Sequence, residues 1–170
     1  DAALAAAPKG STIVVGAKGA QEPATFSGQG WSISDTPGYG YGDGEGLTID
    51  FNGNTFEFTA GKGGNDPRAI YILKNNKITL KNGTLKAADT WANAEENAFG
   101  EFIRSFANGV TLDNMTLDAT NMKTSGGRGI QFLNGDVNII NGTTLLKPTG
   151  TGVTDFYAIK QGDYAGGYTT

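Results

Sequence analysis

Short runs of alternating apolar and polar residues recur along this chain at a nearly constant interval. The run at 77–87 places apolar side chains at Ile78, Leu80 and Leu85, on either side of the pair Asn82-Gly83. Alternation with a period of two predicts strands that bury one face, and an Asn-Gly pair predicts a turn. The run therefore predicts two short strands joined at an asparagine corner.

The same phrase occurs four times. Its corner residues are Asn52, Asn82, Asn114 and Asn141, so the phrase repeats after 30, 32 and 27 residues. Repeats of about 20 to 50 residues are typical of solenoids, in which each unit buries its apolar face against the next. We expect the four asparagines to form a structural ladder in which their side-chain amides bond one another.

A second apolar phrase lies between the first ones. Ile70, Ile103 and Ile130 are spaced by 33 and 27 residues, and each lies 7 or 8 residues before the next corner phrase begins. One repeat therefore holds three short strands, and the rest of the repeat supplies the crossover that parallel strands need. The pattern predicts an all-β fold, a single-stranded right-handed parallel β-helix of about four coils of 27–33 residues. An antiparallel sandwich of the same strands is the alternative.

In a β-helix, three walls of apolar side chains face the interior and stack about 4.8 Å apart on successive coils. The first wall is expected to contain Ile49, Ile78, Leu80, Val110, Leu112, Val137 and Ile139. The second contains Phe56, Leu85, Leu117 and Leu145, and the third contains Ile70, Ile72, Ile103, Ile130, Phe132 and Ile159.

The whole chain, 1–170, is expected to form one domain. Residues 1–10 are rich in alanine and reach a proline and a glycine, which predicts a short N-terminal capping helix. An irregular first coil at 11–46 precedes regular coils at 47–160, and 161–170 form an uncapped end. Open strand edges there allow end-to-end self-association, or a continuation into a longer protein.

Composition excludes several kinds of chemistry. The 170 residues include no cysteine and no histidine, which excludes disulfides, thiol catalysis, a Ser-His-Asp triad and a typical zinc site. The net charge is −4 and basic residues are scattered, which argues against nucleic acid as a partner. No apolar run is long enough for a membrane span, so we expect no membrane insertion.

Charged residues on the repeated phrases favour structural roles over catalysis. Asp113 aligns with Lys81, and Asp118 with Lys86, which predicts salt bridges between coils on a solvated face. Arg68, Glu101 and Arg128 occupy matching places two residues before an isoleucine, which predicts a stacked structural ion-pair column, worth about 0.5–1 kcal/mol if it is exposed. The alternative for the arginines is a lyase-type base or a clamp for a carboxylate. No catalytic residue is assigned.

Two loops are longer than a coil requires, and loops on a rigid scaffold commonly carry binding sites. Their aromatic and acidic residues are the candidate ligand-binding positions, since flat aromatic faces stack on sugars or on partner side chains; these are Tyr39, Tyr41, Trp91, Glu95 and Glu96. Asp43 and Glu45 are candidates for a Ca²⁺ site, although they lack the spacing of an EF-hand loop. No other cofactor is expected. The alternative is that the aromatics only cover the flank of the coils.

The N-terminal residues 1–15 and the phrases at 47–56 and 77–85 resemble those of pectate-lyase-like right-handed parallel β-helix proteins. They are closest in style to secreted or cell-wall-attached bacterial surface proteins. The resemblance implies an extracellular or cell-surface location and a non-catalytic scaffold or adhesion domain that binds carbohydrate or a surface protein. It also leaves open a polysaccharide lyase or glycoside hydrolase, and a module that assembles end to end.

Overall fold

The fold is all-β, and all strand pairs in the described part of the chain are parallel. A computed structural model of the chain describes residues 3, 6–8, 10–16, 23–33, 46–60, 68–72, 77–88, 101–107, 109–122, 127–133, 138–149 and 156–161. Most of these residues lie in strands, and each pair joins strands about one sequence repeat apart. The prediction of an all-β fold built from parallel strands is confirmed, and the parallel pairing excludes the antiparallel sandwich for this part of the chain.

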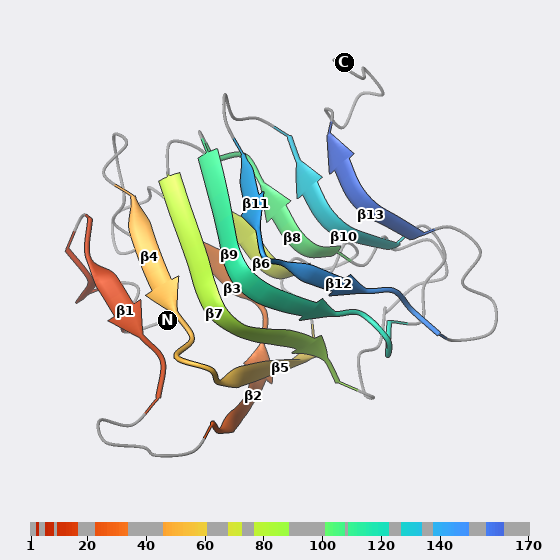
Figure 1. The fold of residues 1–170 in the computed structure, drawn as a ribbon, viewed down its shortest axis with the longest axis horizontal. Helices are drawn as coiled ribbons and strands as arrows, with labels where there is room; N and C mark the ends of the chain where they lie inside the picture. The colour runs from red at the N-terminus through yellow and green to blue at the C-terminus, as the bar shows by residue number, and fades with distance from the viewer. Residues whose placement is uncertain are drawn as a thin grey trace.

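The described strands form two sheets (Figure 1). The eight-stranded sheet contains β1 (Thr12–Val14), β2 (Thr25–Gln29), β4 (Leu47–Asp50), β5 (Thr55–Ala60), β7 (Lys77–Ala87), β9 (Gly109–Asp118), β11 (Ile139–Asn141) and β12 (Thr144–Leu146). The five-stranded sheet has the order β13-β10-β8-β6-β3, and its strands are β3 (Trp31–Ile33), β6 (Arg68–Ile72), β8 (Glu101–Ser105), β10 (Gly127–Phe132) and β13 (Phe156–Gln161).

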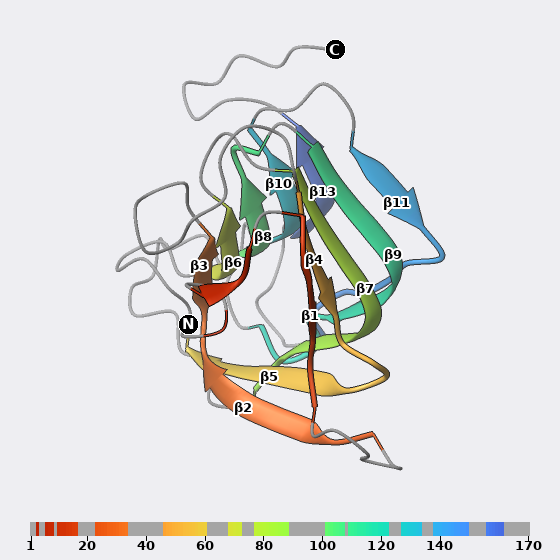
Figure 2. The same cartoon turned by 90° about the vertical axis from the view of Figure 1, so that its left-hand side faces the viewer.

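The eight-stranded sheet is bent, and the bend follows the asparagine corners. The long strands β7 and β9 pass through the bend without interruption. The neighbour of β7 is divided at the bend into β4 and β5, and the neighbour of β9 is divided there into β11 and β12. Asn52, Asn82 and Asn114 have φ of 51°, 57° and 53°, a left-handed conformation that asparagine tolerates better than most residues. In Figure 2 the two arms of this sheet and the five-stranded sheet lie on three sides of the interior.

The fourth corner differs from the prediction by one residue. Asn141 pairs with Asp113, and Gly142 has the left-handed φ of 54° beside the backbone of Asn114. Glycine adopts this conformation at no steric cost, so it takes the corner where the chain offers an Asn-Gly pair. The predicted place of Asn141 in the corner column is therefore wrong.

The core lies between the sheets, and most of the predicted inward residues are in it. Ile78, Leu80 and Leu85 of β7 are at most 1% exposed, as are their neighbours on β9. Two predictions fail at the last coil: Ile139 is 49% exposed because it pairs with Thr111 on the outer face, and Ile159 is 53% exposed because no described strand follows β13. The predicted Val137 lies outside the described residues.

The predicted N-terminal capping helix is not seen in the described part of the chain. What lies there is one hydrogen bond of helical spacing, from the Ala7 N–H to the Ala3 carbonyl at 3.0 Å, followed by Pro8 and by Gly10 with φ 70°. A helix nucleates at a cost that so short a segment does not recover, and proline supplies no N–H to extend it. Ala7 still packs against the end of the core.

Candidate functional site

The outer side of the bend carries a shallow polar hollow of about 410 Å³. Its lining consists of polar side chains and glycines that come from three successive coils: Asp50, Asn52, Gly53, Asn82, Gly83, Thr84, Asn114 and Thr116. The hollow thus lies where the corner phrase repeats, on the face opposite the core.

A directional chain of hydrogen bonds crosses the floor of this hollow. Asn114 Nδ2 donates to Asn82 Oδ1 at 3.3 Å, and Asn82 Nδ2 donates to Asp50 Oδ1 at 3.2 Å. The same oxygen of Asp50 accepts the backbone N–H of Asn52 at 2.9 Å. Each donor points toward the carboxylate, so the bonds polarise one another in the same sense. The ladder of hydrogen bonds thus ends at Asp50, and Asn52 contributes its backbone N–H to it but not its side chain.

The carboxylate of Asp50 is held in its charged form. Burial by itself raises the pKa, but the hydrogen bonds from Asn52, Asn82 and Lys81 and the charge of Lys81 outweigh it, so the pKa of Asp50 lies below its ordinary value. Lys81 Nζ is 3.3 Å from Asp50 Oδ2. At neutral pH the hollow therefore has one fixed negative charge with a lysine beside it.

Threonine hydroxyls line one side of the hollow in a column. Thr55, Thr84 and Thr116 pair in register on β5, β7 and β9, and the column continues to Thr25 and Thr144. The three central threonines are half-buried. Neighbouring strands lie about 4.8 Å apart, so the hollow presents similar amide and hydroxyl groups at each coil. The sequence analysis missed this column, although the threonines follow the corner asparagines at nearly constant spacing, two residues after Asn82 and Asn114 and three after Asn52 and Asn141.

Asn54 is a further polar residue that the sequence analysis missed, and it ties the bend to the first coil. It is 3% exposed, and its Nδ2 donates to the carbonyls of Val15 and Phe51, both at 2.8 Å. Its Oδ1 accepts the N–H of Ala24 at 2.7 Å. A buried amide with all these partners ties the backbone at Val15, Ala24 and Phe51 together, so its role is structural.

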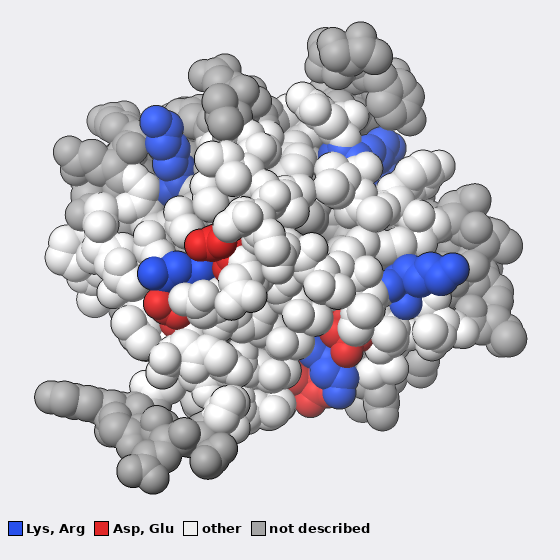
Figure 3. All heavy atoms as spheres, in the orientation of Figure 1, with Lys and Arg blue, Asp and Glu red and all other residues white. Residues whose placement is uncertain are grey.

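The charged groups on the outer face form short ion pairs between coils, and Figure 3 shows acidic and basic atoms side by side there. Lys81 pairs with Asp50, and Lys86 Nζ lies 3.2 Å from Glu57 Oε1. The register matches the predicted alignment of Lys81 with Asp113 and of Lys86 with Asp118, but the ion pairs seen go to the preceding coil.

The two aspartates on β9 have other partners. Asp113 Oδ1 accepts Asn141 Nδ2 at 2.7 Å. Asp118 Oδ1 accepts the N–H and the hydroxyl of Thr120, at 3.0 and 2.6 Å. Each of these carboxylates is thus occupied in holding the fold, which leaves neither positioned as an acid or base beside a free partner.

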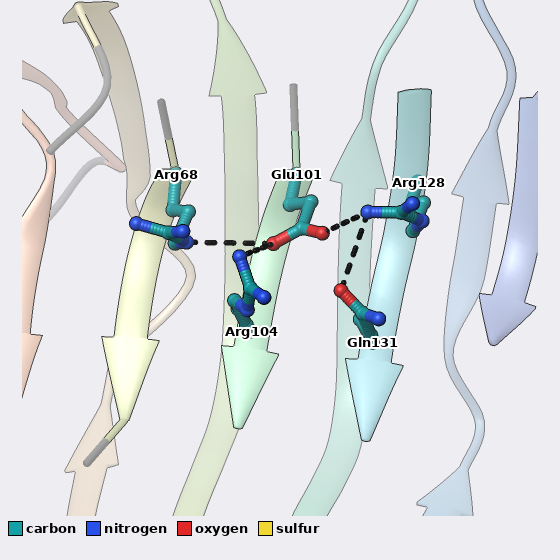
Figure 4. A network of polar contacts seen from close by, with 5 residues as sticks. All are labelled: Arg68, Glu101, Arg104, Arg128 and Gln131. Atoms are coloured by element: carbon teal, nitrogen blue, oxygen red, sulfur yellow. Dashed lines mark hydrogen bonds and ion pairs between the residues drawn. The ribbon is translucent and has the colours of Figure 1, made fainter. Parts of the chain in front are cut away.

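A second polar cluster is buried on the five-stranded sheet (Figure 4). Glu101 on β8 is flanked in register by Arg68 on β6 and Arg128 on β10. Its side chain is 0% exposed, and its carboxylate contacts three guanidinium groups: Arg68 at 3.5 Å, Arg104 at 3.7 Å and Arg128 through a direct hydrogen bond. Arg128 Nη1 also donates to Gln131 Oε1 at 3.3 Å.

Local geometry brings Glu101 and Arg104 together although they are three positions apart on one strand. Residues three apart on a regular strand point to opposite faces, so this contact shows that the alternation is broken here, where Phe102 and Ile103 both belong to the core. Aromatic rings then support the arginines: the Arg68 guanidinium lies 4.5 Å from the ring centre of Tyr71. The predicted column of Arg68, Glu101 and Arg128 is confirmed, and its side chains are buried.

Every ligand-binding and metal-binding candidate from the two long loops lies outside the described residues; these are Tyr39, Tyr41, Asp43, Glu45, Trp91, Glu95 and Glu96. Among the residues that are described, no group of three or more acidic side chains is placed to hold a metal ion. Nor does that part of the chain contain a helix long and apolar enough to cross a membrane.

Comparison with known proteins identifies no relative of this chain. No protein-family model, curated protein or solved structure matches this chain. The function must therefore be argued from the two polar clusters and from the surface of the coils.

Proposed function

We propose that this chain is a right-handed parallel β-helix of about four coils, and that it serves as a non-catalytic extracellular scaffold or adhesion domain that binds carbohydrate. The observation that carries the proposal is the polar hollow on the bend, lined by Asn82, Asn114, Thr84 and Thr116. The extracellular location follows the resemblance to secreted β-helix surface proteins.

The hydrogen-bonding chemistry of the hollow suits sugar hydroxyls. An amide offers two donors and an acceptor oxygen, and a hydroxyl both donates and accepts, so this lining complements a ligand whose groups also do both. The ladder uses one N–H of each amide and leaves the second hydrogen for a ligand. The net charge of −4 and the charged Asp50 favour a neutral glycan over a polyuronate.

A polysaccharide lyase or glycosidase would need carboxylates or an arginine in an accessible pair. The described carboxylates of the outer face, Asp50, Glu57, Asp113 and Asp118, all make the structural contacts given above. Arg68, Arg104 and Arg128 have side chains at most 10% exposed and in contact with Glu101, so a substrate proton is out of their reach. These contacts favour binding without turnover.

The test is a binding titration of neutral and uronic oligosaccharides, followed by isothermal calorimetry and by amide chemical shifts. Thr84→Val removes one hydroxyl from the hollow while keeping shape and strand propensity, and we expect it to weaken binding about 5- to 20-fold. The matched control is Thr79→Val, which removes a half-buried hydroxyl from the same strand outside the hollow and should leave binding unchanged.

Shifts confined to residues outside the bend, or equal effects of the two valine variants, would refute the assignment to the hollow. Turnover of polygalacturonate, measured with and without Ca²⁺ by the absorbance of unsaturated products, would refute the non-catalytic role.

A further inference from the structure

The large hydrophobic side chains that remain exposed are concentrated at one end of the stack. In the described part of the chain they are Ile139 and Ile140 on β11, Leu146 on β12, Tyr157 and Ile159 on β13, with exposed fractions between 39% and 53%, and Val14 on β1. Five of the six thus belong to the last three strands, and the sixth lies at the opposite end. Scattered exposed leucines need no explanation, but a set gathered on one end of the molecule does.

The strands at this end have an open edge. Among the described strands, β11 and β12 pair only with β9, and β13 pairs only with β10. In Figure 1 they are the blue strands β11, β12 and β13. Their outer edges present backbone N–H and C=O groups together with apolar side chains, which is the combination that pairs with another strand.

The size of this surface fits a small protein interface. The five side chains expose roughly 400 Å² of apolar area, as large as the largest patch of a typical monomer. Two such surfaces, with the strand edges between them, reach about 1,000 Å² in total, the lower limit for a specific interface. The interface would also continue the strand-on-strand contact that already joins each coil to the next.

We propose that a second copy of this chain covers this end, related to the first by a twofold axis. Among the described residues, the only large hydrophobic side chain exposed at the other end is Val14, and Ala7 packs against the core there. That end therefore offers little apolar surface to a head-to-tail partner. A twofold axis that passes beside Ile159 of β13 and through the bend at Gly142 places β13 antiparallel to the β13 of the second copy, with the two Ile159 residues directly opposed. The same axis places β11 beside the β12 of that copy, so all five side chains are buried and the assembly closes as a dimer.

This inference is independent of carbohydrate binding, since the hollow and the terminal strands are separate surfaces. Sedimentation velocity over a concentration series up to several hundred micromolar should show a monomer–dimer equilibrium without larger species. Ile159→Lys, at a 53% exposed site that tolerates the change, should weaken dimerisation at least 10-fold. The matched control Val14→Lys, at a 58% exposed site on the opposite end, should leave it unchanged.

The absence of cysteine allows a second test by cross-linking. Directly opposed residues of an antiparallel pair have Cα atoms about 4.5–5.5 Å apart, within the range for a disulfide. Ile159→Cys should therefore form a covalent dimer on mild oxidation, and Val14→Cys should not. A monomer at every concentration, growth beyond the dimer, loss of assembly in Val14→Lys, or efficient cross-linking through Val14→Cys would each overturn the proposal.

Discussion

The buried cluster around Glu101 makes a sharp prediction about stability. Glu101→Gln keeps the shape of the side chain and removes the negative charge that three guanidinium groups contact. The arginines stay charged, because a guanidinium group is not deprotonated in proteins. The variant therefore leaves like charges close together at a place where the Glu101 side chain is 0% exposed to solvent.

The expected magnitude follows from this burial. Breaking a buried ion pair by removing one partner costs about 3–5 kcal/mol, because the remaining charge has lost its compensation. The control is Glu57→Gln, the same substitution in the pair with Lys86, whose side chains are 25% and 37% exposed. Surface pairs of this kind contribute about 0–1 kcal/mol, so the two variants should differ several-fold in their loss of stability.

The assay is urea unfolding followed by circular dichroism, with the midpoint and the slope fitted separately. Since coils of a repeat protein can unfold in steps, an unchanged slope is required before free energies are compared. By calorimetry the melting temperature of Glu101→Gln should fall by roughly 6–20 °C. Equal losses for Glu101→Gln and Glu57→Gln would refute the argument, as would a further loss when Arg128→Gln is added to Glu101→Gln, because removing one arginine should relieve the repulsion.

Three further predictions concern the bend. In urea unfolding, Asn82→Ala should lower the free energy of unfolding by about 1 kcal/mol more than Asn52→Ala does. Both residues have positive φ, so the backbone penalty is the same and only the ladder bonds of Asn82 differ. Equal losses would refute the ladder. Because the pKa of Asp50 is lowered in the folded state, its contribution to stability is present above its unfolded pKa and is lost as the pH falls through its folded pKa. Asp50→Asn should therefore destabilise the protein at pH 7 and much less at pH 2. A loss of stability that is the same at both pH values would contradict this. Gly83→Ala should prevent stable folding, because the added Cβ runs into packed neighbours, whereas Gly142→Ala, where the nearest atom is 3.7 Å away, should cost only about 1 kcal/mol; similar melting curves would refute the packing argument.

The alternation of apolar residues was enough to predict the strands of the central coils and their core faces. Ile78, Leu80 and Leu85 are buried where a period of two places them, and Val110, Leu112 and Leu117 stack on them in register. A strand with one buried face specifies its own register, because a slip of one residue would expose the whole set. This is why the parallel pairing of the two longest strands could be read from the sequence.

At the last coil the same reasoning fails because the corner contains two candidates. An Asn-Gly pair offers two residues that tolerate positive φ: both Asn52 and Gly53 have it, at the second corner Asn82 has it, and at the last corner Gly142 has it. Spacing alone cannot choose between them, and the choice moves the residues before the corner to the other face, whereas Leu145 after it still pairs with Leu117. Ile139 consequently lies on the outer face, opposite Thr111, and Ile140 aligns with Leu112.

The burial of Glu101 was beyond the sequence for a different reason. The matching positions of Arg68, Glu101 and Arg128 predict that they meet, and they do. Whether the three side chains are exposed to solvent depends on what covers the outer face of the five-stranded sheet. Neither the hydrophobic period nor the spacing of the residues predicts that cover. Arg104 joins them only because the alternation of faces breaks at Phe102 and Ile103, which a period-two pattern cannot foresee.

The bend itself limits which residues can carry binding. Gly83 admits no side chain, because a Cβ there would collide with Phe51 and come within 2.8 Å of the carbonyl oxygen of Asn54. Asn82 is required by its left-handed φ and by its two ladder bonds. A change at either residue therefore disturbs folding and binding together. The threonines have no such constraint, since valine fits the same strand geometry. Thr84 and Thr116 are thus the positions at which loss of a ligand can be separated from loss of the fold.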